Sequence, residues 1–382
     1  MISSSIIEIS ESALRNNIDF LKKTLGANCE LSSVVKGNAY GHGIQTHVPV
    51  AEKCGVDHFS VFSAEEAYKA KQVLKKAQVM IMGFIDNNDL QWAIEQDVSF
   101  YVFDGQRLEA ALEVAKRLQK PARIHIEFET GMNRTGFTKK ELKPLVEVLK
   151  TNQEHLTIEG FCTHYAGAES IANDVRVRQQ IKAFKQLDAW MLGKGIEPKK
   201  RHTACSAASM SYPKTRMDMA RIGIMQYGFW PSRETFINYI SGKADKTDPL
   251  KRVITWKSRV MTTQVVKPGE FIGYGTSYMA ESDSIIAIVP IGYAYGFSRS
   301  LSNLGRVLIN GQRVGVMGMV NMNMLIVDIT NVPESKAGDE VILIGKQGDL
   351  EISVSSFGEL SAQLNYELLT RLPHDIPRIV TP

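Results

Sequence analysis

The chain has 382 residues, 44% of them hydrophobic and 23% charged, which is typical of a globular protein. This length exceeds the size at which a single core usually stops growing, so two domains are expected. The formal net charge of +4 is mild, and the short basic clusters lack interleaved aromatic residues, which argues against a nucleic-acid-binding protein.

Short apolar or β-branched runs recur up to residue 224 and predict strands. Helix-period segments lie between most of them, for example at 110–118, 141–149 and 175–192. Eight strand and helix units predict an α/β fold with a parallel (β/α)8 barrel of the TIM type. The expected strands are 31–35, 57–62, 78–83, 97–103, 123–128, 156–163, 200–204 and 219–224.

The pattern changes after residue 232. A polar stretch at 241–249 predicts a linker. Strand-like sequence follows at 252–266 and 284–290, and a hairpin is expected around Asn310-Gly311, a pair suited to a type I′ turn. We therefore expect the barrel at 1–240 and a mainly β C-terminal domain at 241–382.

Two other classes of protein are disfavoured. The N-terminus lacks a basic segment and a sustained apolar run, and no later stretch reaches the roughly 18 apolar residues of a membrane span. We therefore expect a cytoplasmic protein with no membrane association. The four cysteines form no CxxC pair, which predicts neither a disulfide framework nor a metal site.

Lys36 lies where a cation has no evident structural role. It follows the β-branched run at 34–35 and precedes glycines, an asparagine and a tyrosine, where the backbone must turn sharply. A partly buried lysine near other positive groups can lose its proton near neutral pH and form a Schiff base. Pyridoxal phosphate is anchored in this way. The alternative is a surface lysine that enters a loop.

Polar residues also occur at four other strand ends, where this fold places catalytic groups. Taken singly, His164 can be a core histidine, Ser206 a helix N-cap and Arg221 part of a rim ion pair. Their occurrence at matching strand ends favours a site, and Ser206 with the amides of Gly223 and Ile224 can cradle a phosphate. The segments are 130–134 after the fifth strand, 163–165 at the sixth, Ser206 after the seventh and 221–224 at the eighth.

Residues 34–43, Val-Val-Lys-Gly-Asn-Ala-Tyr-Gly-His-Gly, resemble the cofactor-lysine motif of the alanine racemases. The resemblance extends in family order over nearly the whole chain, at 129–136, 163–166, 221–228, 273–276, 291–294 and 365–367. It implies a fold type III isomerase that uses pyridoxal phosphate to interconvert L- and D-alanine and supplies D-alanine for peptidoglycan. It also implies a homodimer with shared active sites, in which the β domain of each subunit covers the partner's barrel and residues 1–10 pack with that domain.

By resemblance, Lys36 and Tyr274 are the two bases of the racemisation. Lys36 serves the D face of the substrate, and Tyr274, from the other subunit, serves the L face. His164 and Arg221 form a hydrogen-bonded chain in which the histidine contacts the tyrosine, and the arginine contacts the histidine and the pyridine nitrogen. A permanently charged Arg221 keeps that nitrogen unprotonated, which weakens the ring as an electron sink.

The resemblance also assigns the binding residues. Arg134 and the backbone amide of Met322 hold the substrate carboxylate, and Tyr293 lines the approach. Tyr366 contacts the phosphate and narrows the entrance. The cofactor-binding residues are Lys36, Tyr40, Ser206, Arg221, Gly223, Ile224 and Tyr366.

Glu127 departs from the family pattern. Many relatives have a lysine there, often carbamylated, whose carboxylate holds the substrate-binding arginine. We hypothesise that Glu127 supplies this negative charge directly and fixes Arg134. The alternative is a rim glutamate with no partner.

Other departures bear on substrate choice. Asn321 and Asn323 stand where the family has cysteine and aspartate, and Met319 stands where a basic residue is common. Tyr295 replaces an aspartate and Cys205 an asparagine. By resemblance, these changes together remove several charges around the entrance. A broad-specificity racemase acting on serine or lysine is therefore the nearer alternative. A fold type III decarboxylase is expected to place an acid where this chain has Arg221, and a non-catalytic pyridoxal phosphate carrier has no second domain.

Overall fold

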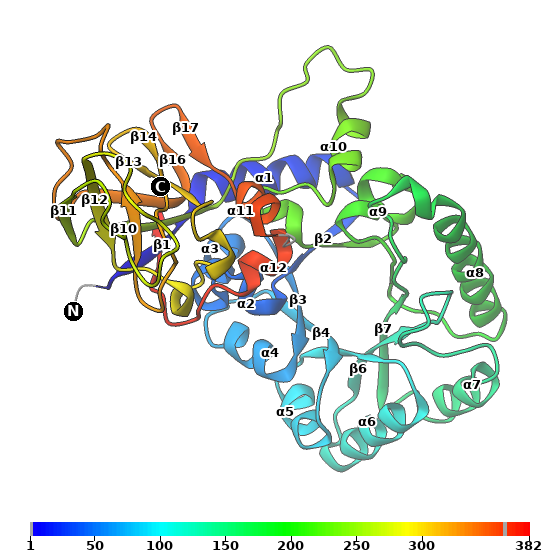
Figure 1. The fold of residues 1–382 in the computed structure, drawn as a ribbon. Helices are drawn as coiled ribbons and strands as arrows, with labels where there is room; N and C mark the ends of the chain where they lie inside the picture. Colours follow the sequence, from blue (N-terminus) through cyan, green and yellow to red (C-terminus); the bar gives the residue numbers. More distant parts are fainter. Residues whose placement is uncertain (1–2, 362–364) are drawn as a thin grey trace. The chain divides into compact units, whose positions relative to one another are not determined.

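The computed structural model describes residues 3–361 and 365–382, and these fall into two compact units. The barrel unit comprises 13–36 and 48–251, and the β unit comprises 1–12, 37–47 and 252–382. Figure 1 traces the chain through both, and the passage from the barrel unit to the β unit after Lys36 is a feature that the sequence did not suggest.

The barrel unit contains the predicted eight parallel strands, in the order β8-β7-β6-β5-β4-β3-β2-β9. An isolated parallel bridge joins Cys205, just after the end strand β8, to Arg221 of the other end strand, β9, so the barrel is nearly closed. The predicted α/β barrel class is therefore confirmed. The strands are β2 (Glu30–Val34), β3 (His58–Ser63), β4 (Gln78–Phe84), β5 (Ser99–Val102), β6 (Ala122–Glu127), β7 (Leu156–Cys162), β8 (Lys200–His202) and β9 (Met219–Ile222).

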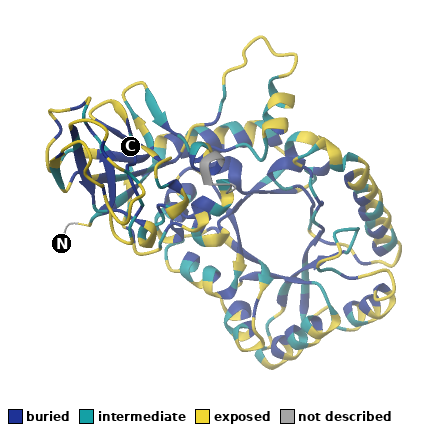
Figure 2. Cartoon of the chain, in the orientation of Figure 1, coloured by how far each residue is buried: buried dark blue, intermediate teal, exposed yellow. Residues whose placement is uncertain are grey.

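Helices surround these strands and bury one face each (Figure 2). In α7 the buried residues Leu142, Leu145, Val146 and Leu149 follow the three- and four-residue spacing of a helical stripe. Several helices begin with a side-chain N-cap, such as Asp104, which accepts a hydrogen bond from the amide of Arg107 at 2.8 Å. The helices of the chain up to the linker are α1 (Glu11–Leu25), α3 (Ile44–Lys53), α4 (Ala64–Lys71), α5 (Leu90–Glu95), α6 (Gly105–Leu118), α7 (Leu142–Thr151), α8 (Asp174–Gly193), α9 (Ser206–Ser211) and α10 (Arg233–Ile240).

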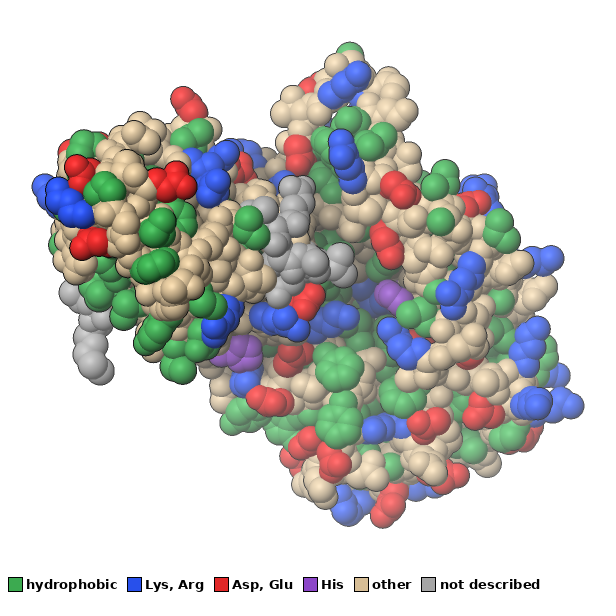
Figure 3. Space-filling view, viewed as in Figure 1, with side chains coloured by type: hydrophobic (Ala, Val, Ile, Leu, Met, Phe, Trp, Pro, Cys, Tyr) green, Lys and Arg blue, Asp and Glu red, His purple; other side chains and the backbone are tan. Residues whose placement is uncertain are grey.

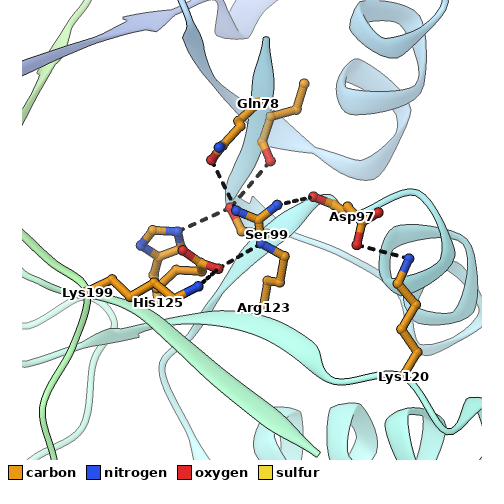
Figure 4. Close-up of polar contacts among 9 residues, drawn as sticks. Gln78, Asp97, Ser99, Lys120, Arg123, His125 and Lys199 are labelled. Carbon is orange, nitrogen blue, oxygen red and sulfur yellow. Dashed lines mark hydrogen bonds and ion pairs between the residues drawn. The ribbon is translucent and has the colours of Figure 1, made fainter. Parts of the chain in front are cut away.

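Ion pairs and hydrogen bonds join the N-terminal ends of neighbouring barrel strands (Figure 4). Arg123 of β6 donates to Glu159 of β7 at 2.8 Å, to Gln78 of β4 at 3.1 Å and to the carbonyl of Asp97 at 3.1 Å. Burial alone would raise the pKa of Glu159, but hydrogen bonds from Arg123 and Lys199 lower it, so the carboxylate stays charged. This end of the barrel contributes to stability, since catalytic groups of the fold lie at the opposite end.

The β unit contains two sheets. One has seven strands, ordered β14-β13-β16-β10-β1-β18 with β17 paired to β16, and the other has the order β11-β12-β15. Its first strand, β1, runs antiparallel to β10 and parallel to β18 near the C-terminus. Residues 1 and 2 lie outside the described residues. The strands are β1 (Ser5–Ser10), β10 (Ile254–Arg259), β11 (Thr262–Val266), β12 (Ser284–Val289), β13 (Arg306–Ile309), β14 (Gln312–Gly315), β15 (Leu325–Asp328), β16 (Glu340–Gln347), β17 (Leu350–Ile352) and β18 (Arg378–Thr381), with helices α11 (Val354–Ser361) and α12 (Asn365–Thr370).

The strand-like sequence at 252–266 forms two strands, β10 and β11, which lie in different sheets. The backbone changes partners between them, because the amide of Val260 donates to the carbonyl of Asp339 at 2.9 Å and that of Met261 donates to the carbonyl of Ile288 at 2.7 Å. The hairpin expected at Asn310-Gly311 is confirmed. Both residues have positive φ, 47° and 73°, as a type I′ turn requires.

Acidic and basic side chains are interspersed over the face of the barrel unit seen in Figure 3. Within the described part of the chain, no helix is long and apolar enough to span a membrane. All four cysteines are free thiols.

Candidate active site

Lys36 follows the C-terminal end of β2, and β-type pairing continues up to it because the amide of Val35 donates to the carbonyl of Ser60 at 2.8 Å. The side chain is open to solvent, yet many protein atoms surround it at the barrel mouth. This desolvation first, and the positive charge of Arg134 second, lower the pKa of Lys36. The neutral amine that a Schiff base requires is therefore favoured.

The segment after Lys36, labelled α2 (Lys36–Tyr40), is a left-handed turn. Gly37, Asn38, Ala39 and Tyr40 have φ values of 62°, 53°, 55° and 51°. Such angles cost little at glycine and asparagine but are unfavourable at alanine and tyrosine, so packing in the β unit must hold them. Tyr40 is buried there, and its ring lies 5.9 Å from the ring of Tyr366 on α12.

Ser206 and Gly223 join the loops that follow β8 and β9. The hydroxyl of Ser206, the first residue of α9, accepts a hydrogen bond from the amide of Gly223 at 3.0 Å. Gly223 directly precedes the short 3-10 helix η4 (Ile224–Tyr227). In this structure the Gly223 amide is used by Ser206, and the Ser206 hydroxyl hydrogen and the other loop amides are donors of the kind that binds phosphate in barrels of this class, so the residues present fit such a group.

Arg221 of β9 is 5% exposed and donates only to neutral acceptors. Its guanidinium contacts Nδ1 of His202 at 2.8 Å, the carbonyl of Thr163 at 2.8 Å and the carbonyl of Thr203 at 3.3 Å. Throughout 3–361 and 365–382, no carboxylate forms a hydrogen bond or ion pair with it. Arg221 therefore keeps its full positive charge at the barrel mouth.

His164 follows β7, beside these groups. Burial, followed by the charges of Arg221, Arg134 and Lys36, lowers the pKa of His164 to about 3, so the ring is neutral at physiological pH. The expected hydrogen bond between the imidazole of His164 and the guanidinium of Arg221 is absent from the described residues, since the guanidinium donates to the backbone carbonyls of Thr163 and Thr203 instead.

Arg134 lies on an exposed loop that Glu129 organises. The Glu129 carboxylate accepts hydrogen bonds from the amides of Gly131, Asn133 and Arg134. Glu127, at the end of β6, is 4% exposed and bonds the hydroxyl of Thr135. In the described part of the chain Glu127 forms no ion pair with Arg134, although the arginine's charge acts to lower the carboxyl pKa against the larger effect of burial, which raises it.

The other predicted residues lie in the β unit, on its surface. Tyr274, between two glycines with φ of 78° and 69°, is 71% exposed. Tyr293 is 41% exposed and Met322 55%. Their two loops pair closely, because the amide of Tyr293 donates to the carbonyl of Asn321 and that of Ala294 donates to the carbonyl of Met322, each at 3.0 Å.

Three polar residues inside the barrel were not predicted from the sequence. Ser99, His125 and His202 lie on β5, β6 and β8, and each is at most 3% exposed. A signal was present, since His125 lies between the apolar Ile124 and Ile126 in the buried part of β6. Its partners come from other strands, however, so the sequence alone does not connect them.

Comparisons with known proteins agree along the whole chain. The alanine racemase N-terminal domain matches 9–231, and the alanine racemase C-terminal domain matches 253–380. An alanine racemase of Leptospira interrogans is 33% identical over 377 residues, which cover 99% of this chain and 96% of the relative.

Solved structures give the same result. An alanine racemase of Clostridium difficile 630 superposes with a TM-score of 0.91 and 28% identity, covering 100% of this chain and 96% of the other. The alanine racemase of Bartonella henselae, solved with covalently bound pyridoxal phosphate, has a TM-score of 0.84 and 26% identity and covers 100% of both chains. Two matching domain models and these relatives together establish that the chain belongs to the alanine racemase family.

Proposed function

We propose that this chain interconverts L- and D-alanine with Lys36 and Tyr274 as its two acid/base groups and with pyridoxal phosphate at the mouth of the barrel. The observation that carries the proposal is the convergence of Lys36, Ser206 and Arg221 at the C-terminal ends of strands of one barrel. When bound, this cofactor withdraws electrons from the α-carbon of an amino acid and so acidifies its α-proton.

Side chains of this protein suit each functional group of the cofactor. With the cofactor bound, Nζ of Lys36 would hold its aldehyde carbon, and Ser206 with the amides of Gly223 and Ile224 would hold its phosphate, assisted by Tyr40 and Tyr366. Arg221 would lie beside the pyridine nitrogen. Because no acidic side chain pairs with Arg221 in the described residues, its cation opposes protonation of that nitrogen.

The two bases act on opposite faces of the substrate. Nζ of Lys36 takes or returns the α-proton on the D face, and its lowered pKa favours the neutral amine that this step needs. The phenol oxygen of Tyr274 does the same on the L face. A neutral His164 has one donor and one acceptor nitrogen with which to orient that phenol.

A second copy of the chain supplies Tyr274, in a homodimer with shared sites. The high exposure of Tyr274, Met322 and Phe271, which is 52% exposed, supports this arrangement, because large apolar groups that gather on a surface mark an interaction site. Arg134 and the backbone amide of Met322 hold the substrate carboxylate, and Tyr293 lines the approach. The product is D-alanine for peptidoglycan.

A broader substrate range is the second candidate. Asn321 and Asn323 flank Met322 and carry no charge. Side-chain discrimination rests on such contacts, so serine or lysine racemisation is an alternative to strict alanine use.

The test combines a substrate panel with deuterium exchange. We expect the optical rotation of L-alanine to fall to zero with the purified enzyme and that of L-serine or L-lysine to do so only if the broader range holds.

In D2O, Tyr274→Phe should still exchange the α-proton of D-alanine through Lys36 but not that of L-alanine. Tyr278→Phe, a half-buried tyrosine nearby in sequence, is the control. Equal loss of both exchanges in Tyr274→Phe would contradict the two-base assignment.

A further inference from the structure

A line of buried hydrogen bonds runs from Arg221 across the inside of the barrel. Nη1 of Arg221 contacts Nδ1 of His202 at 2.8 Å, and Nε2 of His202 contacts Nδ1 of His125 at 2.8 Å. Nε2 of His125 contacts the hydroxyl of Ser99 at 3.1 Å, which contacts the carbonyl of Val79 at 3.3 Å. Figure 4 shows the end formed by His125 and Ser99. The line links β9, β8, β6, β5 and β4.

The chemistry of the two ends fixes the direction of every bond. Arginine has donors only, so Nδ1 of His202 must accept, and a neutral His202 must then carry its proton on Nε2. His202 therefore donates to Nδ1 of His125, and His125 carries its proton on Nε2. At the far end Ser99 donates to the carbonyl of Val79, so its oxygen is the acceptor for His125. Both ends require the same direction.

Burial keeps both imidazoles neutral. Desolvation is the largest cause that lowers the pKa of His125 and of His202 far below the usual range. A protonated ring would have two donors and no acceptor, which would break the line at that point. Arg221 thus remains the charged member, with acceptors aligned toward it.

Gly160 makes the central bond possible. His125 and His202 lie on β6 and β8, with β7 between them, and Gly160 of β7 is the register partner of His125. A Cβ atom on Gly160 would lie 2.4 Å from Nδ1 of His125 and 2.7 Å from Nε2 of His202. These are the two atoms that share the hydrogen bond, so only glycine lets the rings meet across β7.

We propose that His125 and Ser99, acting through His202, are positioning residues that orient the guanidinium of Arg221 and solvate its charge with neutral acceptors instead of a carboxylate. A carboxylate partner would neutralise the arginine, whereas the neutral line holds it in place and leaves its charge directed at the barrel mouth. The inference deepens the proposed function, on which it rests for the role of Arg221 beside the pyridine nitrogen.

The first test reads the tautomers directly in the holoenzyme labelled with 15N-histidine. We expect the signals of His125 and His202, assigned by substitution, to show a protonated Nε2 and an unprotonated Nδ1 between about pH 6 and pH 9. A protonated Nδ1 on either ring overturns the proposal. This readout does not involve a substrate, so it is independent of whether the enzyme proves to racemise alanine.

The second test removes the acceptor for His202. In His125→Phe, Nε2 of His202 loses its partner, so its signals should indicate mixed tautomers, and the dissociation constant of pyridoxal phosphate should rise about fivefold. His125→Asn places an amide oxygen near the lost Nδ1 and should restore the single tautomer. Gly160→Ala, which changes no titratable group, should reproduce the effect of His125→Phe by forcing the rings apart.

An unchanged His202 tautomer and an unchanged cofactor dissociation constant in both His125→Phe and Gly160→Ala contradict the proposal. If these variants fail to fold, the tautomers of the wild-type protein decide the question alone.

Discussion

The charge state of Lys36 is determined by its surroundings at the barrel mouth. Because desolvation and then Arg134 lower its pKa, the neutral amine should predominate at a lower pH than in a free lysine, whose pKa is about 10.4. We predict that the rate at which the apoenzyme takes up pyridoxal phosphate rises with pH and reaches its plateau below the pKa of a free lysine, about 10.4. Visible absorbance measured against pH follows this rate.

Arg134→Gln provides the internal check on this pH profile. Removing the positive charge should move the inflection to higher pH, because the protonated amine is then less disfavoured. Arg176→Gln removes another cation near the same loop, one that donates to the carbonyl of Gly131, and should leave the inflection in place. An inflection that stays fixed in Arg134→Gln would mean that Arg134 does not act on Lys36.

Glu127 is a carboxylate with one oxygen, Oε2, that lacks a hydrogen-bond partner in the described residues. Glu127→Gln should raise the KM for alanine about fivefold, corresponding to about 1 kcal/mol of lost attraction to Arg134, and should leave kcat nearly unchanged. Steady-state kinetics with L-alanine measure both. Glu113→Gln, an exposed change on α6, controls for the loss of one negative charge.

The stability of Glu127→Gln separates this role from a structural one. Burial raises the pKa of the Glu127 carboxyl in the folded protein above its value in the unfolded chain. The folded protein therefore loses stability as the pH rises through the interval between these two pKa values, because Glu127 must then ionise in a buried place. The neutral glutamine removes that cost above this range. We therefore expect an equal or higher melting temperature at pH 8, and a lower one with an unchanged KM would assign Glu127 to structure alone.

At the scale of the element, the left-handed turn after Lys36 depends on Gly41. Its φ is +80°, and a Cβ atom there would lie 1.9 Å from the carbonyl oxygen of Leu369 on α12. Gly41→Ala should lower the free energy of unfolding of the β unit by about 3 kcal/mol, part from the left-handed backbone and part from the clash. Denaturant unfolding followed by circular dichroism measures this.

Gly338→Ala in the same unit separates the two contributions. Its φ is +94°, and a Cβ atom would meet nothing within 4 Å, so only the backbone cost of about 1–2 kcal/mol applies. Equal losses of unfolding free energy in Gly41→Ala and Gly338→Ala would show that the backbone at Leu369 moves aside without an energetic cost.

The short apolar or β-branched runs in the sequence were sufficient to predict the barrel strands. The expected 78–83 and 156–163, for example, correspond to β4 (Gln78–Phe84) and β7 (Leu156–Cys162). The strand-like run at 252–266 is confirmed as strand in β10 and β11, but the point between them where the backbone changes sheets leaves no mark in the sequence. Only the pairing of Val260 and Met261 with different strands reveals the break.

At the scale of the whole molecule, the sequence predicted which strand ends carry polar groups but not their contacts. The rule that parallel strands end at one edge placed Lys36, Ser206 and Arg221 together. The bond between His125 and His202 depends on two strands separated by β7 and on the missing side chain of Gly160. This contact forms only when the strands are assembled into the barrel, so no local sequence pattern predicts it.

Complementation between two inactive variants tests whether two copies of the chain share their sites. In the proposed mechanism Lys36→Ala removes one base and Tyr274→Phe the other, so each variant alone should be inactive as a racemase. If Tyr274 serves the partner's Lys36, a hybrid dimer has one site with both bases and one with neither. Random exchange then restores about 25% of wild-type activity, since half the dimers are hybrids and half their sites are intact.

The alternative gives a clearly different result. If each chain completes its own site, every site in the hybrid lacks one base, and mixing restores nothing. The measurement is alanine racemisation before and after the two inactive variants are unfolded and refolded together, with each variant refolded alone as the control. Recovery therefore reports an exposed Tyr274 of one copy acting with Lys36 of another, whereas its absence in a refolded mixture that contains hybrid dimers excludes the shared site.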